Sequence, residues 1–167
     1  MFGSLNKTKL IKNDLKGIAK LMYQDVSDDT WDQENLTKRN LDFTIESIRY
    51  IDAYTKRLST TQMGRELLKN HFDNFVVRIG AYIGEVIKRN INQDYKWYEY
   101  DSVYHSVYHF SSALDEVHRG IKTETVLYSK KRDRVIMPLA VVAQHLEGNP
   151  AHADFLEYVE EAIKQNS

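Results

Sequence analysis

The sequence predicts an α+β protein with N-terminal helices, a small antiparallel sheet of about three strands, and C-terminal helices. Apolar residues recur at the 3.6-residue period of a helix as far as about residue 90, and again after residue 138. Between these regions, residues 95–104 and the run TETVLYSKKRDRVIM alternate with the period of two that is typical of strands. The 167 residues contain no low-complexity tract, so we expect residues 1–167 to form a single domain.

Three helices are expected before residue 91. The first covers residues 5–23 and is amphipathic, so that residues 1–24 could lie at the periphery of the domain. An acidic stretch, residues 25–34, is either a connector or the capped start of the next helix, and a second helix is expected over residues 36–58. The third helix, residues 63–90, has the longest apolar seam: Leu68, Phe72, Phe75, Ile79, Ile83 and Val86.

Two glycines interrupt the third predicted helix. Gly80 and Gly84 each weaken a helix by up to about 1 kcal/mol relative to alanine, so their presence needs a reason. Their spacing of four leaves a shallow groove, and we expect another element to cross the helix closely there. On a different stripe, Glu85 and Arg89 have the i, i+4 spacing of an ion pair, which we expect to be solvated.

An aromatic run follows, and it supplies the candidate partner-binding residues. We expect a strand over residues 95–104, because Tyr98, Tyr100, Tyr104 and Tyr108 all occupy even positions. Tyrosine and tryptophan are enriched where proteins bind one another, which makes these tyrosines and Trp97 candidate anchors. The alternative is that one face of the strand simply covers the apolar seam, and this is favoured for Trp97.

The rest of the chain predicts a hairpin and two helices. SSALDEVHRG suggests a short helix, and residues 123–129 and 134–137 suggest two strands joined by a charged tip, KKRD. Pro138 suits the first turn of a helix that ends at Gly148. A last helix follows within NPAHADFLEYVEEAIKQ.

Composition narrows the classes of function. The formal net charge of −1 lacks the basic excess typical of nucleic-acid binding, so no nucleic-acid partner is expected. The chain has no cysteine, which excludes disulfides and thiolate metal sites. No apolar run reaches about 20 residues and the first residues lack an export signal, so we expect no membrane partner and a cytoplasmic location.

The stretch DSVYHSVYHF raises the question of a metal site. Asp101, His105 and His109 are spaced by four, which would place them on one face of a helix. In the predicted strand, however, neighbours in this series lie about 13 Å apart, too far to hold one ion. No metalloprotease, nucleophile-elbow or phosphate-loop motif is present either. We therefore expect no catalytic residue, no metal and no cofactor.

Residues 75–148 resemble a family of small bacterial α+β proteins of unknown function. The resemblance rests on a G-x-x-x-G-E-x-x-x-R helix, a following strand, and a hairpin that leads into a helix started by proline. The matching positions are Gly80, Gly84, Glu85, Arg89, the strand near Trp97, and Pro138. This chain departs from the pattern by the extra segment 101–122. Some proteins similar to this family are immunity proteins, which neutralise a toxin from a neighbouring bacterium.

Two functions from different classes follow. The favoured hypothesis is a non-catalytic bacterial immunity protein that binds a cognate toxin acting in the cytoplasm. Its protein partner and its oligomeric state are not specified by the sequence. The alternatives are a metal-dependent or hydrolytic enzyme module centred on Asp101, His105 and His109, and a regulatory subunit of a larger assembly.

Overall fold

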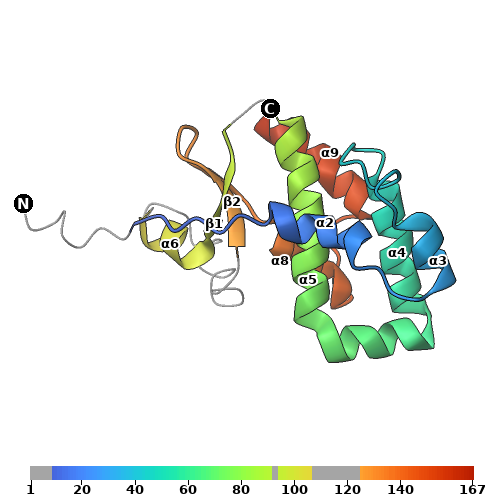
Figure 1. Ribbon diagram of the computed structural model, residues 1–167. Helices are drawn as coiled ribbons and strands as arrows, with labels where there is room; N and C mark the ends of the chain where they lie inside the picture. The colour runs from blue at the N-terminus through green and yellow to red at the C-terminus, as the bar shows by residue number, and fades with distance from the viewer. Residues whose placement is uncertain (1–8, 92–93, 107–124) are drawn as a thin grey trace, which may run out of the picture.

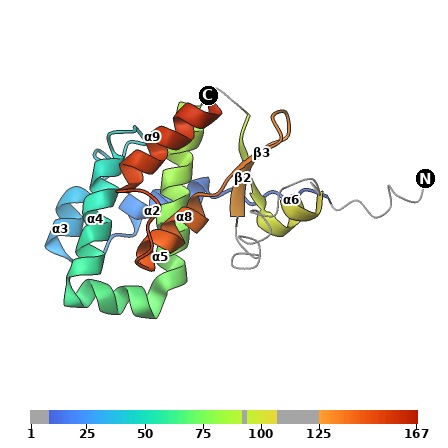
Figure 2. The ribbon, with the colours of Figure 1, turned by 180° about the vertical axis from the view of Figure 1, so that it is seen from behind.

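The computed structural model describes residues 9–91, 94–106 and 125–167. It confirms the α+β class: helices lie before and after a three-stranded antiparallel sheet of order β1-β2-β3. The helices are α2 (Lys16–Gln24), α3 (Thr30–Asn35), α4 (Ile48–Thr60), α5 (Gln62–Asn90), α6 (Tyr100–Ser106), α8 (Pro138–Leu146) and α9 (Phe155–Asn166). The strands are β1 (Lys96–Glu99), β2 (Thr125–Ser129) and β3 (Arg134–Ile136). The sheet and α6 lie beside the helical part (Figures 1 and 2).

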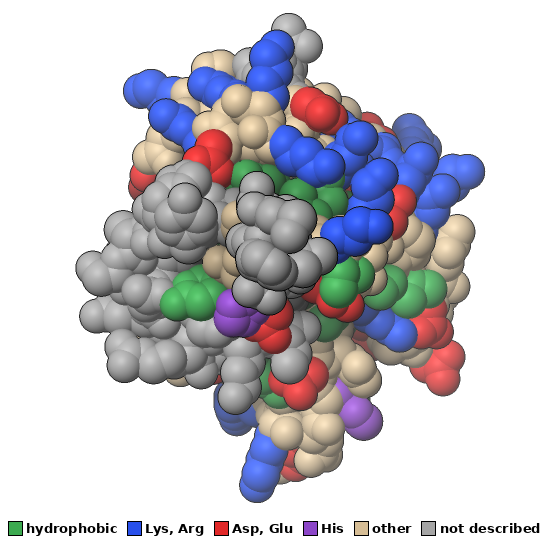
Figure 3. Space-filling model, turned by 90° about the vertical axis from the view of Figure 1, so that its left-hand side faces the viewer, with side chains coloured by type: hydrophobic (Ala, Val, Ile, Leu, Met, Phe, Trp, Pro, Cys, Tyr) green, Lys and Arg blue, Asp and Glu red, His purple; other side chains and the backbone are tan. Residues whose placement is uncertain are grey.

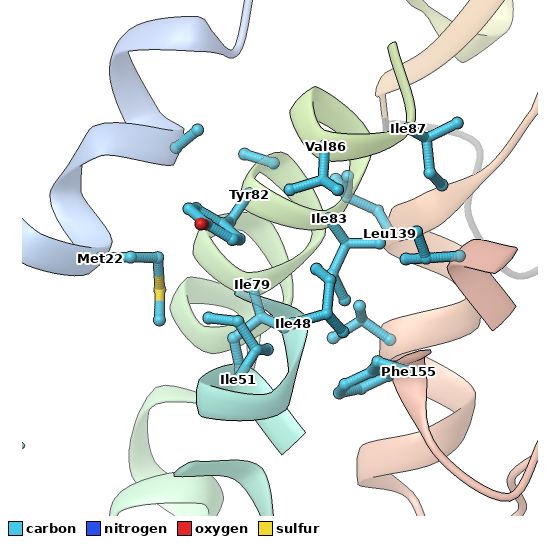
Figure 4. Close-up of a cluster of buried hydrophobic side chains, with 14 of the residues drawn as sticks. Met22, Ile48, Ile51, Ile79, Tyr82, Ile83, Val86, Ile87, Leu139 and Phe155 are labelled. Carbon is cyan, nitrogen blue, oxygen red and sulfur yellow. The ribbon is translucent and has the colours of Figure 1, made fainter. Parts of the chain in front are cut away.

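Helix α5 is the element on which the other helices assemble. Its second half is buried at every position from Ile79 to Ile87, because α2, α4, α8 and α9 all pack around it. Figure 4 shows the resulting cluster, with Met22 from α2, Ile48 from α4 and Phe155 from α9. The prediction for residues 63–90 is confirmed, except that the helix bends at His71, whose φ of −135° is not helical. The first turns of α5 therefore run sideways from α4 (Figure 1).

The two glycines of α5 accept side chains from the hairpin region, as their spacing predicts. A Cβ added at Gly80 would lie 2.7 Å from Cδ1 and 3.0 Å from Cα of Leu139, in α8. A Cβ added at Gly84 would overlap the indole ring of Trp97 and lie 3.2 Å from Cγ of Pro138. These glycines thus let both β1 and α8 approach the helix backbone.

The sheet separates two apolar clusters. Leu127 pairs with Trp97 on one side and Ile136 on the other, and this row faces the main core around α5. Tyr98 pairs with Val126, and both belong to a smaller cluster on the opposite face. Because side chains alternate across a strand, consecutive aromatic residues of β1 supply both cores.

The predicted strand over residues 95–104 is too long. The chain leaves the sheet after Glu99 and forms α6, in which Val103 is fully buried in the smaller cluster. The hydroxyl of Ser102 donates a 2.8 Å hydrogen bond to the carbonyl of Glu99 and stabilises the turn. The spacing of four between Tyr100 and Tyr104 fits one turn of a helix nearly as well as it fits a strand. The helix forms here because it packs Tyr100 and Val103 against Tyr98. The helix expected within SSALDEVHRG lies outside the described residues.

The first predicted helix is also wrong in its first half. Residues 9–14 run beside β1, with an antiparallel bridge between Lys12 and Tyr98. The amide of Glu99 donates to the carbonyl of Ile11 at 2.8 Å, so this segment satisfies the free edge of β1. The helix begins only at Lys16, where Leu15 and Ala19 become buried.

The second predicted helix, residues 36–58, begins twelve residues late. Residues 37–47 form turns, in which the Asp42 carboxylate accepts bonds from the amide and hydroxyl of Thr44. Phe43 has a left-handed backbone, with φ of 64°, and its amide donates to the hydroxyl of Tyr82. Local side-chain bonds of this kind compete with helix formation, and tertiary contact with α5 favours them here.

A carboxylate from α4 holds the start of α9. Asp52 accepts hydrogen bonds from the amides of Phe155 at 2.7 Å and Leu156 at 3.1 Å, two of the amides that a helix leaves unpaired at its start. Asp154 caps the same helix through the amide of Glu157. Burial raises the pKa of Asp52 from 3.8 to about 6, although the two amide bonds oppose this.

We expect Gly84→Ala to lower the free energy of unfolding by about 2 kcal/mol, since a methyl group there overpacks the indole of Trp97. Gly17→Ala is the matched control, because a Cβ at Gly17 meets nothing within 4 Å. That change should stabilise the protein by about 0.5–1 kcal/mol, as alanine favours a helix. Chemical denaturation of the two variants tests this, and equal effects would contradict the packing at Gly84.

The raised pKa of Asp52 predicts that stability falls as pH rises from 4 to 7. Between the ordinary pKa of 3.8 and the folded value of about 6, the folded protein binds more protons than the unfolded chain. Full conversion of this shift gives about 3 kcal/mol, which partial exposure of the carboxyl reduces to about 1–2 kcal/mol. Denaturation of wild type and Asp52→Asn across this range should show wild type losing stability relative to the variant. A difference that stays constant with pH would contradict the assignment.

Candidate functional site

The aromatic residues predicted to bind a partner are mostly in the core. Trp97 is 2% exposed, Tyr98 3% and Tyr100 1%, so none of these rings presents a surface to another molecule. Tyr104 is half-buried and stacks on Tyr100 with ring centroids 6.1 Å apart. Tyr108 lies outside the described residues. The prediction of an exposed aromatic surface is therefore wrong for Tyr98 and Tyr100, because both are buried in one cluster with Val103 of α6 and with Val126 and Tyr128 of β2.

The helix α6 changes the geometry of the possible metal ligands. Asp101 and His105 are one helical turn apart in α6, so the strand spacing of about 13 Å does not apply. His109 lies outside the described residues. Among the residues that are described, no three His, Asp or Glu side chains lie close enough together to hold a metal ion.

Glu85 is buried, contrary to the expected solvated ion pair. Its side chain is 2% exposed and accepts a 2.8 Å hydrogen bond from Nε1 of Trp97. Two cations approach it more loosely, Nζ of Lys88 at 3.6 Å and Nε of Arg89 at 3.7 Å. The pairing with Arg89 was expected from the spacing, whereas the bond to Trp97 requires β1 to cross at Gly84.

Arg89 links this carboxylate to a second set of contacts. Its guanidinium lies 3.7 Å from the ring centroid of Phe43, which in turn stacks on Tyr82 at 4.8 Å. The hydroxyl of Tyr82 lies 2.7 Å from that of Ser47, and burial raises its pKa to about 12. These contacts hold the turns before α4 against α5, so their role is structural.

A hollow of about 600 Å³ lies where α4 turns into α5. Its apolar rim includes Met63 and Leu67, which are 69% and 37% exposed and one helical turn apart. Tyr54 forms part of its wall. Gly64 makes the corner tight, since it packs against the backbone of Leu58. Large exposed apolar side chains at a concave surface are typical of binding sites.

Carboxylates line the other side of the hollow. They are Asp28, Asp29 and Asp32, and the one cation among the lining residues is Arg57. Arg57 lies 3.4 Å from Asp29 and over the ring of Trp31 at 5.2 Å. The hollow therefore carries net negative charge. Lysine and arginine side chains gather instead on the face that Figure 3 shows, at the sheet side of the molecule.

The buried member of this acidic group is Asp32. It is 8% exposed, and burial raises the pKa of its carboxyl although a 2.6 Å bond from the hydroxyl of Ser27 opposes the change. Asp29 caps α3 by accepting from the amide of Asp32 at 3.1 Å. Two of the carboxylates thus shape the loop, and Asp28 is exposed beside them.

The sequence contained part of the signal for this hollow. Residues 25–34 stand out as an acidic stretch, which we interpreted as a connector or the capped start of a helix and not as part of a binding site. The apolar rim is harder to find, because Met63 and Leu67 lie off the apolar seam of α5, which runs through Leu68, and two separate apolar side chains on a helix are not by themselves a signal of a binding site. They are exposed because Gly64 and Leu68 form the buried face of the first turns of α5, and Met63 and Leu67 lie on another face.

Comparisons of the chain with protein-family models, with curated proteins and with solved structures found no match. None of the helices in the described parts of the chain combines the length and the apolar character that crossing a bilayer requires.

We expect Trp97→Phe to destabilise the protein by about 2–3 kcal/mol. The change removes the donor to Glu85 and leaves a buried carboxylate with poorer partners. Trp31→Phe is the control, because that half-buried ring packs at the edge of the core and lies under the guanidinium of Arg57. It should cost about 0.5–1 kcal/mol. Urea denaturation of both variants measures the two losses, and a loss at Trp97 no larger than that at Trp31 would contradict this prediction.

Proposed function

We propose that this chain is a non-catalytic binding protein that neutralises a bacterial toxin by direct contact. The observation that carries the proposal is the hollow at the α4–α5 corner, where exposed apolar side chains and carboxylates lie together. The resemblance of residues 75–148 to small bacterial proteins, some related to immunity proteins, supports the same class of function.

The apolar rim supplies the binding energy in this proposal. Three large hydrophobic side chains are exposed in the described parts of the chain, namely Ile11, Met63 and Leu67. Two of them border the hollow, so a partner that inserts an apolar side chain there removes both from water. Methionine suits such a role because its unbranched side chain adapts to different partner shapes.

The carboxylates supply selectivity for a basic partner. Asp28 and Asp29 lie on the rim, and their field favours lysine or arginine side chains over acidic ones. Toxins that act on nucleic acid carry basic surface at their active sites. We therefore propose that the partner presents a basic surface with an apolar anchor, and that the hollow covers it.

The aromatic run is not the proposed contact surface for the toxin. Trp97, Tyr98 and Tyr100 have little surface left to lose to a partner. Tyr104, which is half-buried, could at most lie at the margin of a contact. The main contact is instead placed on the opposite side of the helical part from the sheet.

Met63→Lys should weaken binding of the cognate toxin by about tenfold to a hundredfold, because it removes an apolar anchor. The toxin candidates are the products of the neighbouring genes, co-expressed with the full chain and purified through a tag. Affinity is then measured by calorimetry, and protection by survival of cells that express the toxin.

Ile11→Lys is the matched control, since Ile11 is 48% exposed on the segment beside β1. It should leave affinity and protection unchanged. If both variants bind equally well, the hollow is not the contact surface. If no neighbouring product binds the wild-type chain, the proposed immunity function itself is contradicted.

A further inference from the structure

The buried carboxylate among the residues that line the hollow has one oxygen without a partner. This carboxylate is Asp32, which is 8% exposed. Its Oδ2 accepts the 2.6 Å bond from the hydroxyl of Ser27, whereas Oδ1 makes no hydrogen bond with any of the described residues. The guanidinium of Arg57 does not fill this place, because it pairs with Asp29 at 3.4 Å. Oδ1 of Asp32 therefore remains available as an acceptor.

The hydroxyl of Tyr54 is a second unpaired group in the same lining. Tyr54 and Asp32 both line the hollow, and both also line a small neighbouring cavity of about 40 Å³. Burial raises the pKa of the Tyr54 phenol, and the negative charge of Asp32 raises it further. The hydroxyl is therefore neutral and lies within the field of the carboxylate, where it can accept a hydrogen bond from a cation.

Both of these oxygen atoms are open to solvent. Among the described residues that are not exposed, the one fully buried side-chain nitrogen or oxygen without a hydrogen bond is Nδ1 of His152. Oδ1 of Asp32 and the hydroxyl of Tyr54 also lack a hydrogen bond with the described residues, so neither atom can be fully buried. Since both residues line the hollow, a group that enters it can reach these two acceptors.

We propose that the hollow binds its partner through one lysine side chain, with the methylene groups on Met63 and Leu67 and the ammonium group on Asp32 and Tyr54. This inference rests on the proposed function and names the chemical group by which the toxin is recognised. A lysine stem covers apolar surface while its head stays charged, so it matches a hollow that combines an apolar rim with carboxylates.

The single free oxygen of Asp32 selects an ammonium group over a guanidinium group. A guanidinium binds a carboxylate best through both oxygens in parallel, and the hydroxyl of Ser27 already bonds to Oδ2. An ammonium group needs only single acceptors, and Oδ1 of Asp32 and the hydroxyl of Tyr54 supply two for its three donors. The site therefore favours lysine over arginine.

Hexylammonium is the probe, because it carries the apolar stem and the charge of lysine. 1-Hexanol has the same chain without the charge, and hexylguanidinium has it with the other cation. Each is titrated at pH 7 into the full chain labelled with ¹⁵N, and NMR follows the backbone amides of Gly64 and Leu67. Hexylammonium should shift these signals saturably, and the other two should bind about fivefold to tenfold more weakly, because they lose or distort the charged bond to Asp32.

Three variants separate the two acceptors from the general field of the hollow. Asp32→Asn keeps the shape of the side chain and should weaken hexylammonium about tenfold, with little effect on 1-hexanol. Tyr54→Phe keeps the carboxylate and should weaken hexylammonium about threefold, so the test stays decisive if Asp32→Asn does not fold. Asp28→Asn removes the same charge from the exposed rim, and salt screening should limit its effect to about twofold.

The inference is overturned if hexylammonium gives no saturable shift, if 1-hexanol or hexylguanidinium binds as tightly, or if Asp28→Asn weakens hexylammonium as much as Asp32→Asn does. These outcomes leave the toxin contact itself to the test with Met63→Lys. Where a neighbouring gene product binds the chain, hexylammonium should compete with it, and a lack of competition overturns the assignment of lysine. If hexylammonium binds and no neighbouring product does, the toxin is contradicted and the ammonium site stands.

Discussion

The contact of Trp97 with Gly84 and Glu85 is the constraint on which the rest of this fold depends. The indole ring lies directly on the glycine, and its nitrogen donates to the adjacent buried carboxylate. This one side chain therefore sets both the distance and the orientation between β1 and α5. Because β2 pairs with β1 and leads through β3 into α8, the position of Pro138 against Gly84 follows from the same contact.

A buried carboxylate is a demanding way to fix this geometry. Glu85 must leave water, which is unfavourable unless its oxygens are well paired. The short bond from Trp97 and the looser contacts with Lys88 and Arg89 offset that penalty only in one arrangement of strand and helix. Apolar packing alone would tolerate a shifted strand, and the hydrogen bond does not. The carboxylate thus favours a unique docking more than it favours stability.

The same docking decides which surfaces remain for binding. The aromatic run is used on both faces of the sheet, with Trp97 in the main core and Tyr98 in the smaller one. The first turns of α5 bury Gly64 and Leu68, and they leave Met63 and Leu67 exposed beside the acidic loop. The packing around α5 therefore buries the aromatic side chains of β1 and leaves Met63 and Leu67 exposed.

The sequence alone determined the order of most elements and much of α5, because a periodic apolar seam and a strand-turn-strand pattern are local signals. It also indicated that Gly80 and Gly84 accept a close neighbour. It failed where distant contacts outweigh local preference, as at Phe43, whose amide bonds to Tyr82 in place of a helix carbonyl. At Tyr100, periods of two and of nearly four coincide, and only the need to cover Tyr98 selects the helix. The hollow was likewise decided by tertiary structure, since it joins the acidic loop before α3 to the corner between α4 and α5.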